Sequence, residues 1–350
     1  SDQSVHKGVR VSGFDRILVW GGGAIGGTFA ASIAAAGHDV TLVDVNRDHI
    51  AAISANGLTV ELPERTIVSR LSAVHRDDLV GQFDLVLLAV KADRTSQAAG
   101  ELMPHRMPKA PVVSLQNGLC ELELEPLLGG GNVVGGFINF GSDIVGPGRI
   151  RVGNRGAVVV GEVDGGTLPR TGAIRDLLAV YEPRAIVSGN ILGYLWGKQA
   201  YSAVLKSSAL SADALVAFIE DPRWQKANIA LIREVLRVAR AEAVEPLGFD
   251  GFEPAAFEAD DASAGEALAR MADLYLGSSK THSSAWRDLA VLRQPTDAAA
   301  QTAPIVAAAR RHGLEVPLLM EMIHCIGRLE RGEVAQGDVL VEEWIRGARA

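Results

Sequence analysis

The chain is short of the features that hold secreted, metal-binding and membrane proteins together. Its 350 residues include two cysteines, Cys120 and Cys325, which give neither a disulfide framework nor a metal-ligand spacing. No uninterrupted apolar run is longer than Leu85 to Val90, which is far too short to cross a membrane. These absences argue against a disulfide-stapled domain, a cysteine metal site and a membrane span, and we expect a cytoplasmic protein.

The chain also lacks a basic run. Its formal net charge is −8, which argues against nucleic-acid binding because that function needs a basic face. The apolar and charged fractions, 48% and 22%, are those of an ordinary globular protein, and the length favours two domains. Residues 1–15 are polar without an apolar core, so we expect a flexible tail and not a signal peptide.

The most informative stretch that is present runs from Arg16 to Gly27, where RILVW leads into GGGAIGG. In a dinucleotide-binding fingerprint, Gly21 would permit the tight turn, Gly23 the close approach of a pyrophosphate, and Gly26 the packing of the next helix on its strand. The backbone of Ala24 and Ile25 would open that helix beneath the phosphates. The alternative is that the glycines only allow close packing.

The sequence around the glycines completes this pattern. We predict a strand over 17–20, a helix over 24–36 ended by Gly37, and a second strand over 40–43 that leads into Asp44. A carboxylate there can accept hydrogen bonds from the ribose hydroxyls and repels a 2′-phosphate. NAD(H) is therefore the favoured cofactor, with NADP(H) possible because Arg47 lies nearby.

The remaining pattern predicts an α/β protein: an N-terminal Rossmann domain with a doubly wound parallel sheet over 16–185, and an all-helical domain over 186–350. In the first domain we expect a helix over 46–56, a hairpin of 58–62 with 66–71, and strands over 83–90, 112–115 and 133–138. Two short strands, 149–152 and 157–160, should form a meander that closes the sheet. The alanine-rich, acidic segment 253–269 is predicted to be a mobile excursion.

Polar residues follow two of the predicted strands. Lys91 comes directly after the apolar run that ends at Val90, and Asn117 follows the next strand. Ligands of an open parallel sheet bind beyond the carboxyl ends of its strands, so both side chains point to one crevice. Taken singly, Lys91 could be a solvated lysine, and Asn117 could serve only the turn at Gly118.

A second group of candidates is Lys198, Ser202 and Lys206, which are spaced along one side of a predicted helix. The alternative is a solvated stripe, above all for Lys206. Bulky neighbours, Trp196, Tyr201 and Leu205, surround Lys198. Partial desolvation lowers the pKa of a lysine, so Lys198 is predicted to exchange a proton near neutrality.

A third polar stretch covers 279–288 and continues through 293–297. It contains Ser284 and, before a helix that should start near Thr296, Asp297. Either Thr296 or Asp297 could simply be the helix N-cap.

With these residues in place, the chain after its tail resembles the ketopantoate (2-dehydropantoate) reductase family. The resemblance rests on six ordered motifs: Gly21-Gly-Gly-Ala-Ile-Gly26, Val90-Lys-Ala92, Gln116-Asn-Gly118, Gly146-Pro-Gly148 with Gly161-Glu-Val-Asp-Gly165, Trp196-Gly-Lys198 and Ser283-Ser284. It implies an NAD(P)H-dependent reductase of a 2-keto acid, or a 2-hydroxy acid dehydrogenase in reverse, with the substrate between a Rossmann and a helical domain.

The resemblance also implies roles for single residues. Lys198 matches the lysine that protonates the substrate oxygen. Lys91 and Asn117 match residues that line the nicotinamide and keto-acid crevice, and Ser284 matches a serine that helps bind the substrate carboxylate. Asp297 stands near a helix-opening glutamate that orients the substrate oxygen.

Three departures bear on the substrate. Ser202 and Lys206 stand where the family has asparagines, Thr281 replaces another, and the acid Asp297 falls one residue late, so that Thr296 is the ungapped match. The smaller serine and the added positive charge predict a substrate whose distal group is either larger than that of ketopantoate or acidic.

Two other functions stay open. An opine-type dehydrogenase would need a catalytic histidine, for which His282 is the only histidine beside a candidate motif. A non-catalytic dinucleotide sensor would have no use for the proton donor Lys198. The expected partner is a small keto or hydroxy acid, with no nucleic acid or membrane, and a homodimer is possible.

Overall fold

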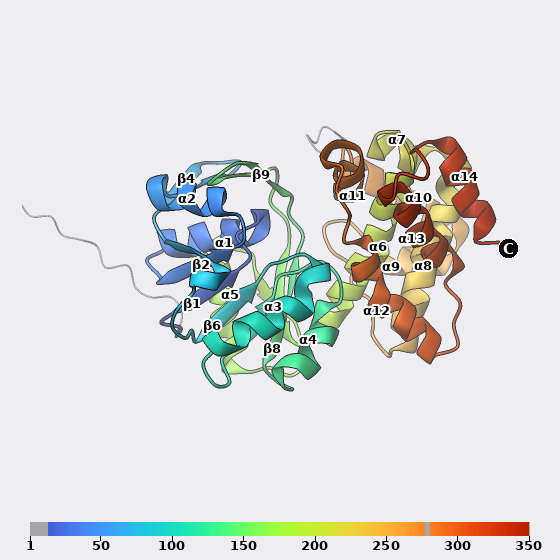
Figure 1. Cartoon of the computed structure of the whole chain (residues 1–350). Helices are drawn as coiled ribbons and strands as arrows, with labels where there is room; N and C mark the ends of the chain where they lie inside the picture. Colours follow the sequence, from blue (N-terminus) through green and yellow to red (C-terminus); the bar gives the residue numbers. More distant parts are fainter. Residues whose placement is uncertain (1–12, 277–280, 350) are drawn as a thin grey trace, which may run out of the picture. The chain divides into compact units, whose positions relative to one another are not determined.

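The structure is a computed structural model that describes residues 13–276 and 281–349. Its backbone contacts divide the chain into two compact units, which meet in sequence at Ile191 and Leu192 (Figure 1). Residues 1–12 of the predicted tail lie outside the described residues. At the end of the tail, the backbone N–H of Asp15 donates to the Asp84 carboxylate, 2.7 Å away.

The first unit is built on an eight-stranded sheet in the order β12-β11-β8-β7-β6-β1-β2-β5. The strands are β1 (Ile17–Trp20), β2 (Val40–Asp44), β5 (Ser72–His75), β6 (Leu85–Leu88), β7 (Val112–Ser114), β8 (Val133–Ile138), β11 (Val158–Glu162) and β12 (Ile186–Val187). All neighbours pair in parallel except β11 with β8. The doubly wound parallel sheet predicted from the sequence is confirmed.

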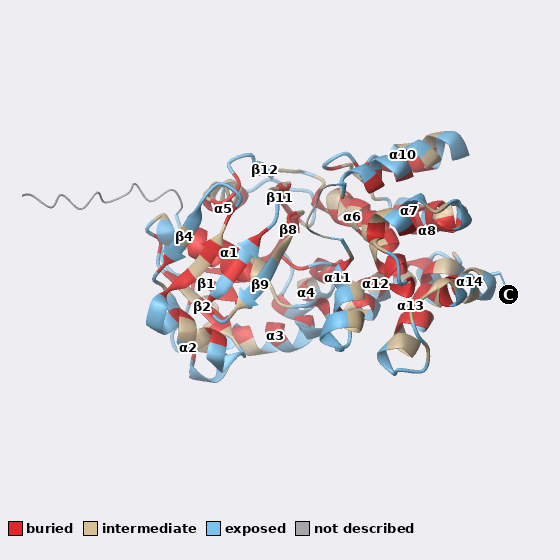
Figure 2. Ribbon diagram, turned by 90° about the horizontal axis from the view of Figure 1, so that it is seen from above, coloured by how far each residue is buried: buried red, intermediate tan, exposed pale blue. Residues whose placement is uncertain are grey.

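Burial on both faces explains the apolar strands. Ile17 and Val19 belong to one hydrophobic core, and Leu18 and Trp20 belong to another, because successive side chains of a strand point to opposite faces. The buried residues are drawn red in Figure 2. Helices α1 (Ala24–Ala35), α2 (Arg47–Asn56), α3 (Thr95–Leu102), α4 (Cys120–Leu128) and α5 (Pro169–Leu178) complete this unit.

A second, four-stranded sheet has the order β4-β3-β10-β9. Its strands are β3 (Leu58–Glu61), β4 (Thr66–Ser69), β9 (Ser142–Gly146) and β10 (Arg149–Val152). The predicted hairpin of β3 and β4 is confirmed, but the meander that should close the main sheet is wrong. β10 pairs with β3 in the second sheet, whereas β11 joins the main sheet beside β8.

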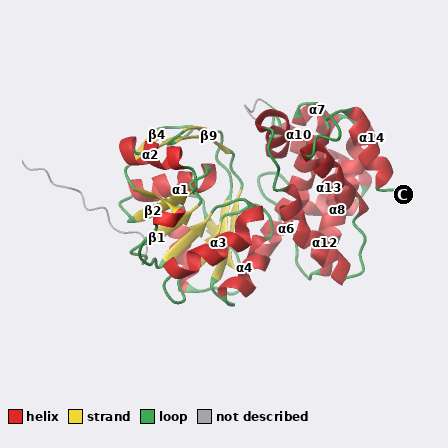
Figure 3. Cartoon of the chain, viewed as in Figure 1, coloured by secondary structure: helices red, strands yellow, loops and turns green. Residues whose placement is uncertain are grey.

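The second unit contains helices and loops among its described residues (Figure 3). Its helices are α6 (Ile191–Ser207), α7 (Leu215–Glu220), α8 (Pro222–Ala241), α9 (Pro254–Ala259), α10 (Asp261–Asp273), α11 (Ser284–Arg287), α12 (Ala298–Arg311), α13 (Pro317–Glu330) and α14 (Asp338–Gly347). The all-helical C-terminal domain is confirmed. Segment 253–269 is no excursion, because α9 and α10 bury Phe257 and Leu268.

The division between the units falls later in the chain than the predicted boundary at residue 185. The reason is β12, whose residues Ile186 and Val187 pair with β11 and so belong to the main sheet. β12 could not be predicted from the sequence, since two residues carry no periodicity of their own.

Candidate functional site

The glycine-rich loop between β1 and α1 has the geometry of an anion-binding turn. Gly21 has a φ of +110°, and a Cβ there would lie 2.9 Å from the Ala89 carbonyl carbon. A Cβ on Gly26 would overlap the Gly21 carbonyl oxygen. A Cβ on Gly23, in contrast, would meet no protein atom within 4 Å. The open space at Gly23, at the N-terminus of α1, suits a dinucleotide pyrophosphate, so the residues of this loop fit such a cofactor.

Asp44 ends β2 beside this loop. Its Oδ2 accepts a hydrogen bond from the Gly22 N–H at 2.8 Å, and its Oδ1 accepts one from the Asn46 N–H at 2.8 Å. The guanidinium of Arg47 contacts other residues: it lies 3.4 Å from the Asp78 carboxylate and 3.2 Å from Nδ1 of His75. The acid is therefore fixed against the glycine loop, and the nearby arginine is engaged elsewhere.

Lys91 and Asn117 are exposed at the ends of neighbouring strands β6 and β7. The buried side chain of Gln116 connects the two ends, because its Nε2 donates to the Val90 carbonyl at 3.1 Å and to Oγ1 of Thr95 at 2.9 Å. Gly21 packs against the same Ala89–Val90 backbone. The first unit thus gathers the glycine loop, Lys91 and Asn117 at one end of the sheet.

Helix α6 carries the second set of candidates on one side, as predicted. Lys198 and Ser202 are half-buried, whereas Lys206 is 5% exposed. The Nζ of Lys206 donates to Oγ of Ser202 at 2.8 Å. Burial lowers the pKa of the Lys206 ammonium to about 8, and the negative charge of Asp297 opposes that shift. The solvated alternative for Lys206 is therefore wrong, because burial desolvates its ammonium.

The serine pair divides into two roles. Ser283 is buried and caps α11, where its Oγ accepts from the Trp286 N–H at 3.2 Å and lies 3.2 Å from Oγ of Ser208. Ser284 is exposed on the first turn of the helix. His282 stacks on the ring of Trp286, with ring centroids 3.7 Å apart. Residues 279 and 280 of this polar stretch lie outside the described residues.

Thr296 and Asp297 are adjacent in the chain but have different contacts. Thr296 is committed to structure, because its Oγ1 donates to Glu330 at 2.7 Å and accepts from the Ala298 N–H at 3.2 Å. Asp297 is half-buried and acts electrostatically on Lys206.

A π turn over Asp288–Leu292 precedes this pair and ends at Arg293, which has a φ of 50°. The Arg293 N–H bonds to the Asp288 carbonyl, so the turn holds one residue more than an α turn. This wide turn lies between Ser283 and Asp297 along the chain.

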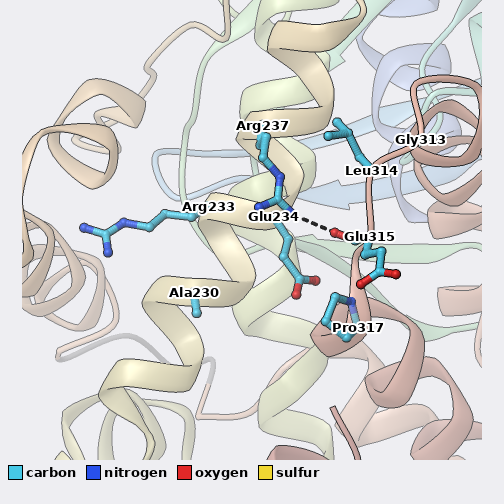
Figure 4. Close-up of a pocket in the computed structure, with 8 residues that line it drawn as sticks. All are labelled: Ala230, Arg233, Glu234, Arg237, Gly313, Leu314, Glu315 and Pro317. Carbon is cyan, nitrogen blue, oxygen red and sulfur yellow. Dashed lines mark hydrogen bonds between the residues drawn. The ribbon is translucent and has the colours of Figure 1, made fainter. Parts of the chain in front are cut away.

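A pocket of about 550 Å³ lies elsewhere in the second unit, between α8 and the segment before α13 (Figure 4). It is lined by Ala230, Arg233, Glu234, Arg237, Gly313, Leu314, Glu315 and Pro317. Arg237 donates to the Glu315 carbonyl, and Arg233 to the Phe257 carbonyl. The Glu234 carboxylate accepts the N–H groups of Leu318 and Leu319, which begin α13. These polar groups join helices, and the predicted site residues are not among them.

Two further buried polar residues, Gln116 and His49, were not among the site residues predicted from the sequence. Gln116 lies directly before Asn117 and is buried, and its side chain holds the ends of two strands together. His49 lies on α2 and bonds to Gly22 and to Gly148, 99 residues further along the chain. No local pattern indicates so distant a partner.

Together, the two units define a class of protein: a Rossmann-type dinucleotide-binding unit followed by a helical unit that carries a lysine-rich polar face. Residues 17–165 match the family described as ketopantoate reductase PanE/ApbA, and residues 190–330 match its C-terminal domain. The chain belongs to the ketopantoate reductase family. Its members are NADPH-dependent oxidoreductases that act on a CH–OH group, and the family binds NAD(P)H.

Similar proteins agree with this assignment. The 2-dehydropantoate 2-reductase of Pyrococcus abyssi is 28% identical over 191 residues, which cover 54% of this chain and 62% of that protein. The structure of a ketopantoate reductase from Ralstonia eutropha JMP134 superposes with a TM-score of 0.76 at 23% identity, covering 91% of this chain and 99% of that one.

D-mandelate dehydrogenase, in a ternary structure with NADH and anilino(oxo)acetate, has a TM-score of 0.77 at 19% identity, with the same coverage. At these identities the structural likeness concerns the fold. None of the helices described in the structure is long and apolar enough to span a membrane.

Proposed function

We propose that the protein is an NADH-preferring reductase of a 2-keto acid, reversible as a 2-hydroxy acid dehydrogenase, with Lys198 as its proton donor. The observation that carries the proposal is the polar side of α6, where Lys198 and Ser202 are half-buried and the buried Lys206 ammonium donates to Ser202 and feels the charge of Asp297. Family membership supplies the reaction class.

The roles proposed for the chain's residues follow from charge and placement. When bound, the dinucleotide supplies the hydride that reaches the keto carbon. Lys198 donates a proton to the substrate oxygen as negative charge develops there. The exposed Ser284 hydroxyl helps bind the substrate carboxylate, and Asp297 orients the substrate oxygen. Lys91 and Asn117 line the nicotinamide end of the first unit.

The cofactor preference rests on Asp44. A carboxylate held by the Gly22 and Asn46 N–H groups suits ribose hydroxyls and repels a 2′-phosphate. Arg47 is engaged with Asp78 and His75, so it is not preset for a phosphate. The test is kcat/KM with NADH and with NADPH under one set of conditions. Equal values, or a higher value with NADPH, contradict the preference.

The substrate proposed is a 2-keto acid whose distal group is uncharged and larger than that of ketopantoate. The acidic group expected as an alternative is less favoured, because an added anion near Lys206 would also meet the Asp297 carboxylate. Ser202 is smaller than an asparagine, so it leaves more room for the distal group of the substrate. Its hydroxyl already accepts a hydrogen bond from Lys206, so it offers that group less polar interaction. The aromatic keto acid analogue bound by D-mandelate dehydrogenase is of this size class.

One panel of assays tests the reaction and the substrate. NADH oxidation is measured with ketopantoate, with phenylglyoxylate and with a dicarboxylic 2-keto acid, each with and without an amino acid. We expect turnover without the amino acid and the highest kcat/KM for phenylglyoxylate. Turnover only with the amino acid would identify an opine-type enzyme. No turnover despite NADH binding would identify a sensor, and ketopantoate as best substrate would contradict the size argument.

A further inference from the structure

The buried imidazole of His49 links the glycine-rich loop to a turn of the second sheet. His49 lies on the first turn of α2 and is 2% exposed. Its Nδ1 accepts a hydrogen bond from the Gly148 N–H at 3.0 Å, in the turn between β9 and β10. Its Nε2 lies 3.0 Å from the Gly22 carbonyl oxygen.

These two contacts fix the tautomer. A backbone N–H can only donate, so Nδ1 is the bare, accepting nitrogen. A carbonyl oxygen can only accept, so Nε2 carries the proton and donates it to Gly22. The backbone of His49 is held as well, because its N–H donates to the Asn46 side chain at 3.1 Å. The ring therefore has a single place and a single protonation pattern that satisfy both of its neighbours.

Gly22 is consequently held on both of its polar groups. Its N–H donates to Asp44 and its carbonyl accepts from His49. In a trans peptide unit, the carbonyl and the following N–H point in opposite directions. Fixing the Gly22 carbonyl toward His49 therefore turns the Gly23 N–H away from the imidazole. The space around Gly23 is open, because a Cβ there would meet no protein atom within 4 Å.

We propose that His49 is a positioning residue for the cofactor, which presets the Gly23 N–H to bind the pyrophosphate, and that the Gly146-Pro-Gly148 turn orients its imidazole. The turn contributes through Gly148, whose φ is +68° and whose N–H orients the imidazole. This inference rests on the proposed dinucleotide site, and it does not depend on which keto acid is reduced.

Two matched substitutions separate this role from a merely structural one. In His49→Gln the amide nitrogen can replace Nε2 toward Gly22, whereas in His49→Asn the shorter amide can replace only Nδ1 toward Gly148. Each variant loses one of two buried hydrogen bonds, so similar losses of stability are expected. Ser69→Ala is the control, because it deletes the 2.6 Å bond from Ser69 Oγ to the Ala31 carbonyl without touching the loop.

The experiment measures Kd for NADH by titration, with KM and kcat at saturating keto acid and the melting temperature of every variant. A hydrogen bond to a charged group contributes enough that His49→Asn should raise the Kd about ten- to a hundredfold, with kcat at saturating NADH nearly unchanged. His49→Gln and Ser69→Ala should stay within about threefold of the wild type, since the Gly22 contact remains. Equal Kd changes in the two His49 variants, or none, overturn the inference.

A second measurement covers the case in which His49→Asn does not fold. Hydrogen exchange at the Gly148 amide is followed in the wild-type protein with and without ADP-ribose. Slower exchange with ADP-ribose supports the link between turn and cofactor, and unchanged exchange overturns it. Failure of the wild-type protein to bind NADH, NADPH or ADP-ribose would instead contradict the proposed function.

Discussion

Replacing Lys206 by methionine should make the protein more stable near neutral pH. Lys206 is 5% exposed, and burial lowers its pKa from the usual 10.5 to about 8. Between these two values the unfolded chain binds more protons than the folded one, so the lysine's contribution to stability rises with pH through that window. Below pH 8 the ammonium is charged in both states, and the full cost of burying it remains.

The size of the effect follows from the same shift. One pKa unit corresponds to about 1.4 kcal/mol, so the charged lysine costs roughly 3 kcal/mol at pH 7. At pH 9.5 most of the folded population carries a neutral amine, and the remaining cost, that of deprotonating the lysine, is roughly half of that. Methionine has a similar length and no charge, so Lys206→Met should recover most of this free energy at pH 7 and less at pH 9.5. The Asp297 charge, which favours the ammonium, is already contained in the pKa.

The assay is urea unfolding of the wild type and of Lys206→Met at several pH values from 7 to 9.5. Lys226→Met on α8 serves as the control, because Lys226 is exposed and its removal changes the net charge equally. We expect a stability gain for Lys206→Met that shrinks as the pH rises, and no such trend for the control. A difference that stays flat, or grows with pH, would refute the assignment of Lys206 as a buried, desolvated cation.

Three further outcomes follow from the structure. Lys198→Ala should lose roughly 10²- to 10⁴-fold in kcat with little change in melting temperature, and a variant that melts earlier yet turns over normally would rule out the catalytic role. Glu234→Ala should reduce the free energy of unfolding by about 1–3 kcal/mol in urea titrations, because two N–H groups of α13 lose their acceptor; an unchanged midpoint would contradict this. Asp44→Ala should narrow the ratio of kcat/KM for NADH over NADPH, and an unchanged ratio would assign the preference to another residue.

The sequence predicted the elements whose signals are local. The glycine fingerprint, the helix capped at Asn46 and the β3–β4 hairpin all depend on neighbouring residues, and the structure has them where they were expected. The assignment of β10 to its sheet could not be predicted. It is decided by pairing with β3, some ninety residues earlier, and no local pattern indicates so distant a partner.

The candidate site shows the same limit. Spacing alone placed Lys198, Ser202 and Lys206 on one side of a helix, because the helical period is fixed. Spacing could not show that Lys206 is buried, since its surroundings include Asp297 from a distant helix start. The bulky residues close to Lys198 in the sequence favoured that lysine as the desolvated one, and no local signal indicated the deeper burial of Lys206.

The π turn over Asp288–Leu292 bears on how this chain tolerates changes in length. A helix can absorb one inserted residue as a single wide turn, so that the segments before and after it keep their own positions. Here the buried cap Ser283 lies before the turn and the acid Asp297 lies after it. An insertion between them therefore reaches neither the serine pair nor the start of α12, and the spacing of functional residues along the sequence can drift while their places in the helical unit are kept.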